Sequence, residues 1–204
     1  MTVLVTGFDP FGGDPFNLSE KVLSALAVSN STSRTPTIDT MIVPTRYGVA
    51  ASKIIERRKL KSYSTVLMLG QSEGGGPMQI ERFAVNAMDS DGADNSGIRH
   101  AGTPIDVDGP AARQTNVDLR KLQQFLIARS VRFVRSNHAG TFVCNDLYYR
   151  ILNACAGDEP VATALFVHLP CGPFRMAQEP FDRAAIVNDF TRDVTILIDG
   201  LRAD

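Results

Sequence analysis

The sequence is dominated by an alternation of short apolar runs with longer stretches of helical periodicity. TVLVTG (2–7), IDTMIVP (38–44) and TVLMLG (65–70) are short and rich in Val, Ile and Leu, which is typical of strands buried in a parallel sheet. Between them, residues 17–28 and 46–60 carry apolar side chains at helical spacing, and the first of these stretches opens with an Asn that can cap a helix. This alternation predicts an α/β fold.

The second half of the chain resumes the alternation after an irregular stretch. We expect residues 78–89 to form a strand and the polar, turn-rich residues 90–110 to form a long loop. The later elements are expected as a helix at 117–129, a strand at 131–135, a helix at 144–157, a strand at 161–170 and a helix at 178–202. We therefore predict a single domain over residues 1–204, a three-layer α/β/α sandwich around a twisted, mostly parallel (mixed) sheet.

Composition and charge narrow the classes of function. With 204 residues and a net charge of −1, the chain suits one stable domain and has no basic surplus for nucleic acid or an anionic membrane. No apolar run resembles a signal peptide or reaches the length of a membrane span, so we expect a cytoplasmic protein with thiols rather than disulfides. No CxxC or HExxH motif is present, and we expect neither a metal nor a cofactor.

Three cysteines could carry chemistry. Cys144 would open a helix after a glycine-bearing turn, where the helix dipole and free N–H groups favour a thiolate and can stabilise an oxyanion. The alternative is a small buried side chain, and position alone does not decide between the two. Cys155 lies on the apolar face of the same predicted helix, which favours a packing role. Nothing in the sequence directs Cys171 towards a site.

A thiol nucleophile needs a base, and His168 is the favoured candidate. It ends a strongly apolar predicted strand, at the edge where α/β sites gather, whereas His100 lies in the long loop and His138 in a turn. The alternative for His168 is an ordinary hydrogen-bonded polar group. A carboxylate on the second ring nitrogen would fix the tautomer, and spacing leaves four candidates open: Glu81, Asp89, Asp91 and Asp94.

Five motifs together resemble pyroglutamyl peptidase I, the pyrrolidone-carboxylate peptidase family of cysteine peptidases. They occur in the family's order over residues 2 to about 173: GFDPFGG (7–13), GQSEGG (70–75), ERFAVNAMD (81–89), SNHAGTFVCNDLYY (136–149) and FVHLP (166–170). The resemblance implies a cysteine omega-peptidase that hydrolyses the N-terminal pyroglutamyl residue from peptides through a thioester intermediate.

The resemblance also implies individual roles. Cys144 would be the nucleophile, His168 the general base and acid, and Glu81 the orienting carboxylate. The residues implied to line the lactam pocket, or to bond the lactam by side chain or backbone, are Phe8, Phe11, Asn17, Gln71, Phe142 and Val143. The implied partners are N-terminally pyroglutamylated peptides and further copies of the chain in a homo-oligomer, a tetramer by resemblance. No metal or cofactor is implied.

Two departures from the family pattern keep alternatives open. Gly75 and Asp91 stand where the family usually has arginine. At position 91 a carboxylate replaces a cation, which removes a positive field that would favour the thiolate of Cys144. These changes motivate a second hypothesis, a related thiol amidase with altered lactam or acyl specificity. A third hypothesis is a non-catalytic binding homologue, against which the presence of Cys144, His168 and Glu81 argues.

Overall fold

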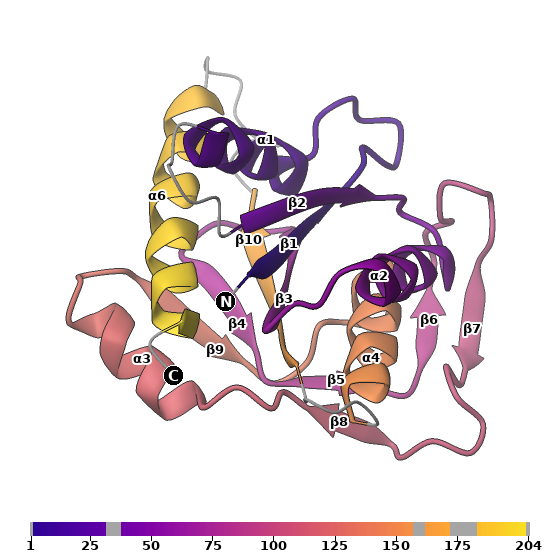
Figure 1. Ribbon diagram of the computed structural model, residues 1–204. Coiled ribbons are helices and arrows are strands. Elements are labelled where there is room, and N and C mark those ends of the chain that lie inside the picture. Colours follow the sequence, from indigo (N-terminus) through magenta and orange to yellow (C-terminus); the bar gives the residue numbers. More distant parts are fainter. Residues whose placement is uncertain (1, 32–37, 157–161, 172–182, 203–204) are drawn as a thin grey trace.

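A six-stranded sheet forms the centre of the protein (Figure 1). The structure is a computed structural model that describes residues 2–31, 38–156, 162–171 and 183–202. The strands follow the order β2 (Ile38–Val43), β1 (Val3–Phe8), β3 (Thr65–Ser72), β10 (Thr163–Pro170), β4 (Met78–Glu81) and β9 (Phe133–Ser136). The first four run parallel, and β4 and β9 run parallel to each other but antiparallel to β10. The mixed sheet confirms the predicted fold class.

Helices cover both faces of the sheet (Figure 1). One face packs on α1 (Leu18–Ser31), α3 (Leu119–Ile127) and α6 (Arg183–Arg202), and the other packs on α2 (Val49–Leu60) and α4 (Val143–Cys155). Alternate residues of β3 divide between the two cores, because successive strand side chains point to opposite faces. Leu67 and Leu69 face the first core, and Val66 and Met68 face the second.

The middle of the chain differs from the prediction. The expected strand at 78–89 is broken into β4, β5 (Phe83–Val85) and β6 (Met88–Ser90). β5 pairs with the unanticipated β8 (Ala112–Gln114), and β6 pairs with β7 (His100–Thr103), which lies inside the expected loop at 90–110. These strands are three or four residues long, too short for a periodicity signal.

The helices agree with the prediction in position and differ at their ends. α2 begins at Val49 rather than residue 46, because Gly48 takes a positive φ of 69° at the N-cap. Asp118 caps α3 by accepting hydrogen bonds from the N–H groups of Arg120 and Lys121. Gly157, expected just past α4, and the expected start of the last helix at 178–182 lie outside the described residues.

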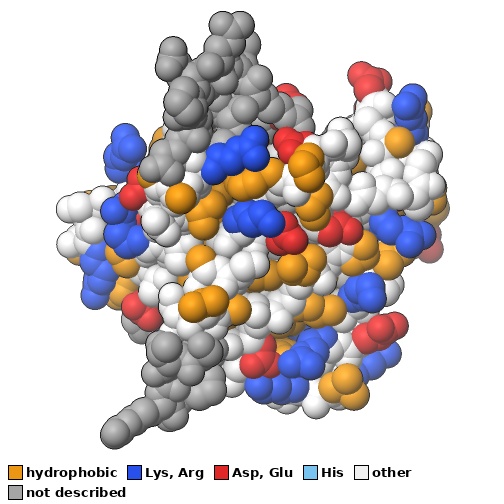
Figure 2. All heavy atoms as spheres, turned by 90° about the horizontal axis from the view of Figure 1, so that it is seen from above, with side chains coloured by type: hydrophobic (Ala, Val, Ile, Leu, Met, Phe, Trp, Pro, Cys, Tyr) orange, Lys and Arg blue, Asp and Glu red, His pale blue; other side chains and the backbone are white. Residues whose placement is uncertain are grey.

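Surface charge is mixed on the face shown in Figure 2. Lys and Arg side chains are interspersed there with Asp and Glu side chains, and apolar side chains lie between them. Among the described residues, no helix combines the length and the apolarity that crossing a membrane requires.

Gly7 lets the start of α1 approach the end of β1. A Cβ atom on Gly7 would lie 2.8 Å from the carbonyl oxygen of Ser19. The side chain of Ser19 accepts a hydrogen bond from the N–H of Phe8 at 3.0 Å and donates one to Asn17 Oδ1 at 2.8 Å. The close approach therefore fixes the strand end that carries Phe8.

We expect Gly7→Ala to lower the free energy of unfolding by about 1–3 kcal/mol, because an overpacked Cβ against backbone forces strand and helix apart. Urea denaturation measures this change. Gly92→Ala is the matched control, since a Cβ there would meet only Ser90 Oγ at 3.6 Å. A Gly7→Ala variant as stable as wild type would contradict the close-packing argument.

Candidate active site

Cys144 is the second residue of α4, at the amino end of the helix. The preceding turn contains Gly140 at a φ of 74°, and Phe142 occupies the N-cap. The N–H groups of Asn145 and Asp146 both donate to the carbonyl of Phe142. Within the described chain, the N–H groups of Val143 and Cys144 have no hydrogen-bond acceptor. These two N–H donors and the positive end of the helix dipole are therefore at the same end of α4 as the partly exposed sulfur of Cys144.

His168 and Glu81 meet across the antiparallel pair β10–β4. Phe166 lies directly opposite Glu81, so His168, two residues further along β10, is a diagonal neighbour of Glu81 on the same face. The imidazole Nδ1 is 2.7 Å from Glu81 Oε1, and both side chains are buried. The carboxylate thus fixes the ring orientation and leaves Nε2 as the nitrogen for another partner.

The surroundings of His168 stabilise its charged form. Burial by itself lowers the pKa of the imidazole, but interactions with Cys144 and Glu81 outweigh it and raise the pKa from 6.5 to about 9. The ring of Phe166 also packs at 4.8 Å from the imidazole, measured between centroids. The site therefore favours an imidazolium between a carboxylate and the Cys144 sulfur.

Gly70 brings the sulfur and the imidazole together. It pairs with His168 in the parallel register of β3 and β10. A Cβ on Gly70 would lie 3.1 Å from Cys144 Sγ and 2.7 Å from the ring of Phe166. The sulfur therefore rests over the strand position next to the base, in space that a larger residue would occupy.

A cavity of about 520 Å³ opens onto Cys144 and His168. Its walls come from three places: the end of β1 and the loop after it, the end of β6 and the turn after it, and the segment before α4 (residues 139–142). Aromatic rings form part of the lining, since the residues at 11 and 142 pack with centroids 6.1 Å apart. A cavity with aromatic walls and a few polar groups suits a small, flat, neutral ligand.

Most of the expected lactam-binding residues line this cavity. Phe8, Phe11, Asn17, Gln71 and Phe142 are among its lining residues. Val143 is different: its side chain is fully buried in the core between α4 and the sheet. Only its backbone could therefore take part in binding.

The polar lining residues differ in how much of their hydrogen-bonding capacity is already used. Gln71 Oε1 accepts the N–H of Leu18 at 2.8 Å, and no acceptor for its Nε2 is recorded among the described residues. Asn17 donates to the carbonyl of Asp9 and accepts from the N–H and the hydroxyl of Ser19. Gln71 thus keeps a donor for a ligand, whereas Asn17 chiefly organises the start of α1.

The other candidate carboxylates have different environments. Asp89 and Asp91 are exposed. Asp94 is buried, and it accepts hydrogen bonds from the backbone of its own turn and from the N–H of Tyr47. Among the four, Glu81 is the carboxylate that the structure places on His168.

The other histidines and cysteines do not line the cavity. His100 is in β7, where its ring packs against a tyrosine, and His138 is exposed. Cys155 and Cys171 are both buried. None of these four residues lines the cavity.

Asn145 is a site residue that the sequence analysis did not single out. It follows Cys144 and is fully buried. Its side chain accepts the N–H of Val85 at 2.9 Å and donates to the carbonyls of Val85 and Ala87 at 2.8 and 2.9 Å. The adjacent polar residues Asn145 and Asp146, at the start of a mainly apolar helix, are the sequence signal that could have revealed it, because buried polar groups need hydrogen-bond partners.

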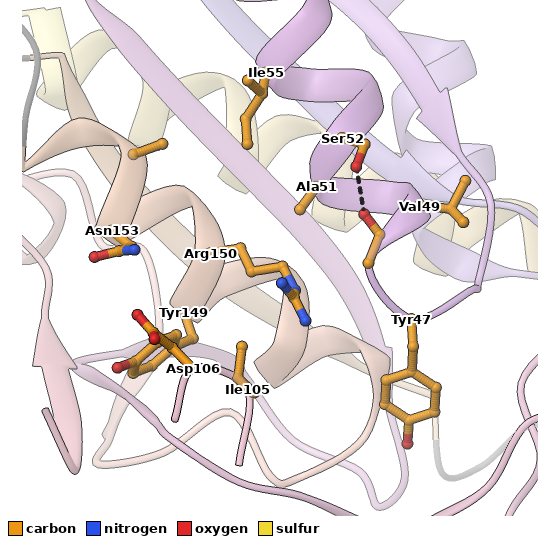
Figure 3. A pocket seen from close by; sticks show the side chains of 12 residues that line it. Tyr47, Val49, Ala51, Ser52, Ile55, Ile105, Asp106, Tyr149, Arg150 and Asn153 are labelled. Carbon is orange, nitrogen blue, oxygen red and sulfur yellow. Dashed lines mark hydrogen bonds between the residues drawn. The ribbon is translucent and has the colours of Figure 1, made fainter. Parts of the chain in front are cut away.

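A second cavity of about 600 Å³ lies between α2 and α4 (Figure 3). Arg150, which lines it, bonds through Nε to the buried Asp146 at 2.7 Å. Ser52 donates to the carbonyl of Gly48 at 2.9 Å, the bond drawn in Figure 3. This lining contains neither cysteine nor histidine, so the candidate nucleophile and base, Cys144 and His168, belong to the first cavity. No cluster of three or more potential metal ligands occurs in the described part of the chain.

Comparison with known proteins agrees with this geometry. The family model described as pyroglutamyl peptidase matches residues 1–199. The chain belongs to the pyroglutamyl peptidase family. This confirms the family predicted from the motifs.

Relatives of known family match nearly the whole chain. A pyrrolidone-carboxylate peptidase of Thermoanaerobacter sp. (strain X514) is 32% identical over 198 residues, which are 97% of this chain and 96% of the relative. The crystal structure of Bacillus amyloliquefaciens pyroglutamyl peptidase I has a TM-score of 0.87 at 28% identity and covers 100% of this chain and 97% of its own. The pyrrolidone carboxyl peptidase of Fervidobacterium islandicum AW-1 has a TM-score of 0.86 at 30% identity, covering 100% and 99%.

We expect Gly70→Ala to slow alkylation of Cys144 by iodoacetamide and to lower kcat by about 100-fold, because the added methyl group displaces the sulfur and the ring of Phe166 that supports His168. Mass spectrometry of the labelled peptide and steady-state kinetics measure the two effects. Asn153→Ala, at an exposed position of α4 that does not line this cavity, is the control. Wild-type labelling and kcat in a folded Gly70→Ala variant would contradict this account.

Proposed function

We propose that this chain acts as a cysteine peptidase that removes N-terminal pyroglutamate from peptides, with Cys144, His168 and Glu81 as its catalytic set. The observation that carries the proposal is the 2.7 Å bond between His168 Nδ1 and Glu81 Oε1, which leaves the other ring nitrogen to serve the sulfur that rests over Gly70. The family supports the peptidase over the amidase and over the binding-only hypothesis.

The proposed reaction has two steps. The Cys144 thiolate attacks the carbonyl carbon of the pyroglutamyl bond, and the oxyanion is stabilised by the N–H groups of Val143 and Cys144 at the start of α4. The imidazolium of His168 gives its proton to the leaving amine, so the C–N bond breaks and a thioester remains. Neutral His168 then takes a proton from water and the resulting hydroxide attacks the thioester. The C–S bond breaks, the acid product forms and the sulfur departs as a thiolate, which restores the starting pair of thiolate and imidazolium.

The cavity supports recognition of a lactam. The rings of Phe11 and Phe142 would pack on the two faces or edges of the five-membered ring, which is flat and uncharged. Gln71 Nε2 would donate to the lactam carbonyl, since its Oε1 is held by Leu18. A pocket shaped for one ring also accounts for selection of the N-terminal residue.

We propose further that residues 1–204 form one domain. The six-stranded sheet supports this proposal, because its strands come from both halves of the chain. We also propose a cytoplasmic homo-oligomer, as the family resemblance implies. Cys144 is a free thiol, which fits a reducing compartment.

The first test is release of a fluorescent amine from a pyroglutamyl-amide substrate. We expect Cys144→Ala to reduce turnover by at least about 10⁴-fold, because it removes the nucleophile. Cys155→Ala is the matched control on the same helix and should retain turnover. A folded wild-type protein without turnover, or a Cys144→Ala variant that keeps it, would refute the proposed function.

The pH dependence follows from the raised pKa of His168. Activity needs the imidazolium, so kcat/KM should fall as the pH rises through about 9. Glu81→Gln should move this alkaline limb to lower pH, because the carboxylate is one cause of the raised pKa. The same shift contributes folding stability that is present below pH 6.5 and is lost as the pH rises through about 9. An alkaline limb that stays in place in Glu81→Gln would contradict the role of the carboxylate.

A further inference from the structure

Two walls of the active-site cavity are separate in sequence and are joined by a small set of hydrogen bonds. One wall contains Phe8, Phe11 and Thr45, from the end of β1 and the loops after β1 and β2. The other, the 90–93 wall, is formed by Ser90, Gly92 and Ala93, at the end of β6 and in the turn after it. The β6–β7 hairpin that carries the second wall is not part of the six-stranded sheet. Its position over the cavity therefore depends on local contacts.

Asn95 makes three of these contacts. Its side-chain Nδ2 donates to Asp9 Oδ1 at 3.1 Å and to the carbonyl of Pro10 at 2.9 Å. Its backbone N–H donates to the carbonyl of Thr45 at 2.9 Å. Asp9 Oδ1 also accepts the N–H of Thr45 at 2.7 Å, so one carboxylate oxygen holds both sides together.

The neighbouring Asp94 makes the turn that presents Asn95. Its Oδ1 accepts the N–H groups of Ser96 and Ile98 at 2.8 and 3.0 Å, and its Oδ2 accepts the N–H of Tyr47 at 3.0 Å. The ring of Tyr47 in turn packs edge-on against Phe142, with centroids 5.6 Å apart. The turn is therefore rigid and is tied to the aromatic lining of the cavity.

We propose that Asn95 is a specificity-determining residue of the peptidase, a positioning residue that clasps the 90–93 wall to the loop that carries Phe8 and Phe11. The inference rests on the proposed function and adds a residue that does not itself line the cavity. The clasp sets the width of the slot between the two walls. A fixed width favours a five-membered lactam and rejects larger rings, because an added methylene cannot be accommodated without separating the walls.

The test compares two substrates in wild type and Asn95→Ala: an amide of pyroglutamate and the same amide of its six-membered lactam homologue. We expect KM for the five-membered substrate to rise on the order of 5-fold, with kcat changed by less than about 2-fold, because two side-chain hydrogen bonds at an exposed site are lost. A wall that can move should also reduce the discrimination against the larger ring, which one methylene can set at about 10-fold or more.

Exchanging the aspartate and the asparagine between positions 9 and 95 distinguishes a positioning role of Asn95 from a general loss of protein stability. Asn95→Asp places a carboxylate against Asp9 and should raise KM further than Asn95→Ala. Combining Asn95→Asp with Asp9→Asn restores a donor and acceptor pair, and we expect it to recover part of the lost affinity and selectivity. Asn153→Ala, on the exposed side of α4 in the second cavity (Figure 3), is the control and should match wild type.

The outcomes distinguish the two proposals. Wild type without turnover of the pyroglutamyl amide would refute the proposed function and this inference with it. Wild-type turnover combined with unchanged KM and unchanged ring selectivity in Asn95→Ala would refute the clasp alone. So would equal losses in kcat for both substrates without a change in KM, or a charge exchange that recovers nothing.

Discussion

The buried bond between His168 and Glu81 is the interaction on which the site depends. Two ionisable groups taken out of water are costly unless each faces a partner at good geometry. The antiparallel pairing of β10 with β4 supplies that geometry as a diagonal cross-strand contact, so the sheet itself holds the carboxylate on the imidazole. The reversed direction of β4, which β9 shares, thus has a chemical consequence, because this pairing places Glu81 diagonally beside His168 on the same face of the sheet.

Small residues let the other parts approach this pair. Gly70 leaves space over β3 for the sulfur of Cys144, and Gly7 leaves space for the start of α1 near the end of β1. At both positions a larger residue would clash with neighbouring atoms. Neither glycine has a φ in the left-handed region, so close packing and not backbone conformation is the reason for glycine. The sulfur, the imidazole and the wall carrying Phe8 consequently converge at one edge of the sheet.

Sequence periodicity was sufficient to predict the layers of the fold and to place Cys144 at the start of a helix and His168 near the end of a strand. Long buried strands and amphipathic helices leave strong signals in a sequence. Periodicity could not identify the carboxylate that bonds to His168. Glu81, Asp89, Asp91 and Asp94 lie close together in sequence, and only the pairing of β4 with β10 separates them. The resemblance to a family implied Glu81, whereas spacing could not. The breaks that divide residues 78–89 into three strands were missed, as were β7 and β8, because the pairing of these short strands is set by tertiary contacts.

The departures from the family pattern can be weighed against this geometry. Asp91 is exposed and does not line the cavity, although its neighbours at 90 and 92 do. A charge in water is screened, so its effect on the thiolate is smaller than that of the buried carboxylate on His168. The hydrogen bonds that hold this loop are made by the side chains of Asp94 and Asn95, which follow Asp91 in the sequence. The altered residue therefore lies between two residues that line the cavity, while His168 and Glu81 keep their hydrogen bond.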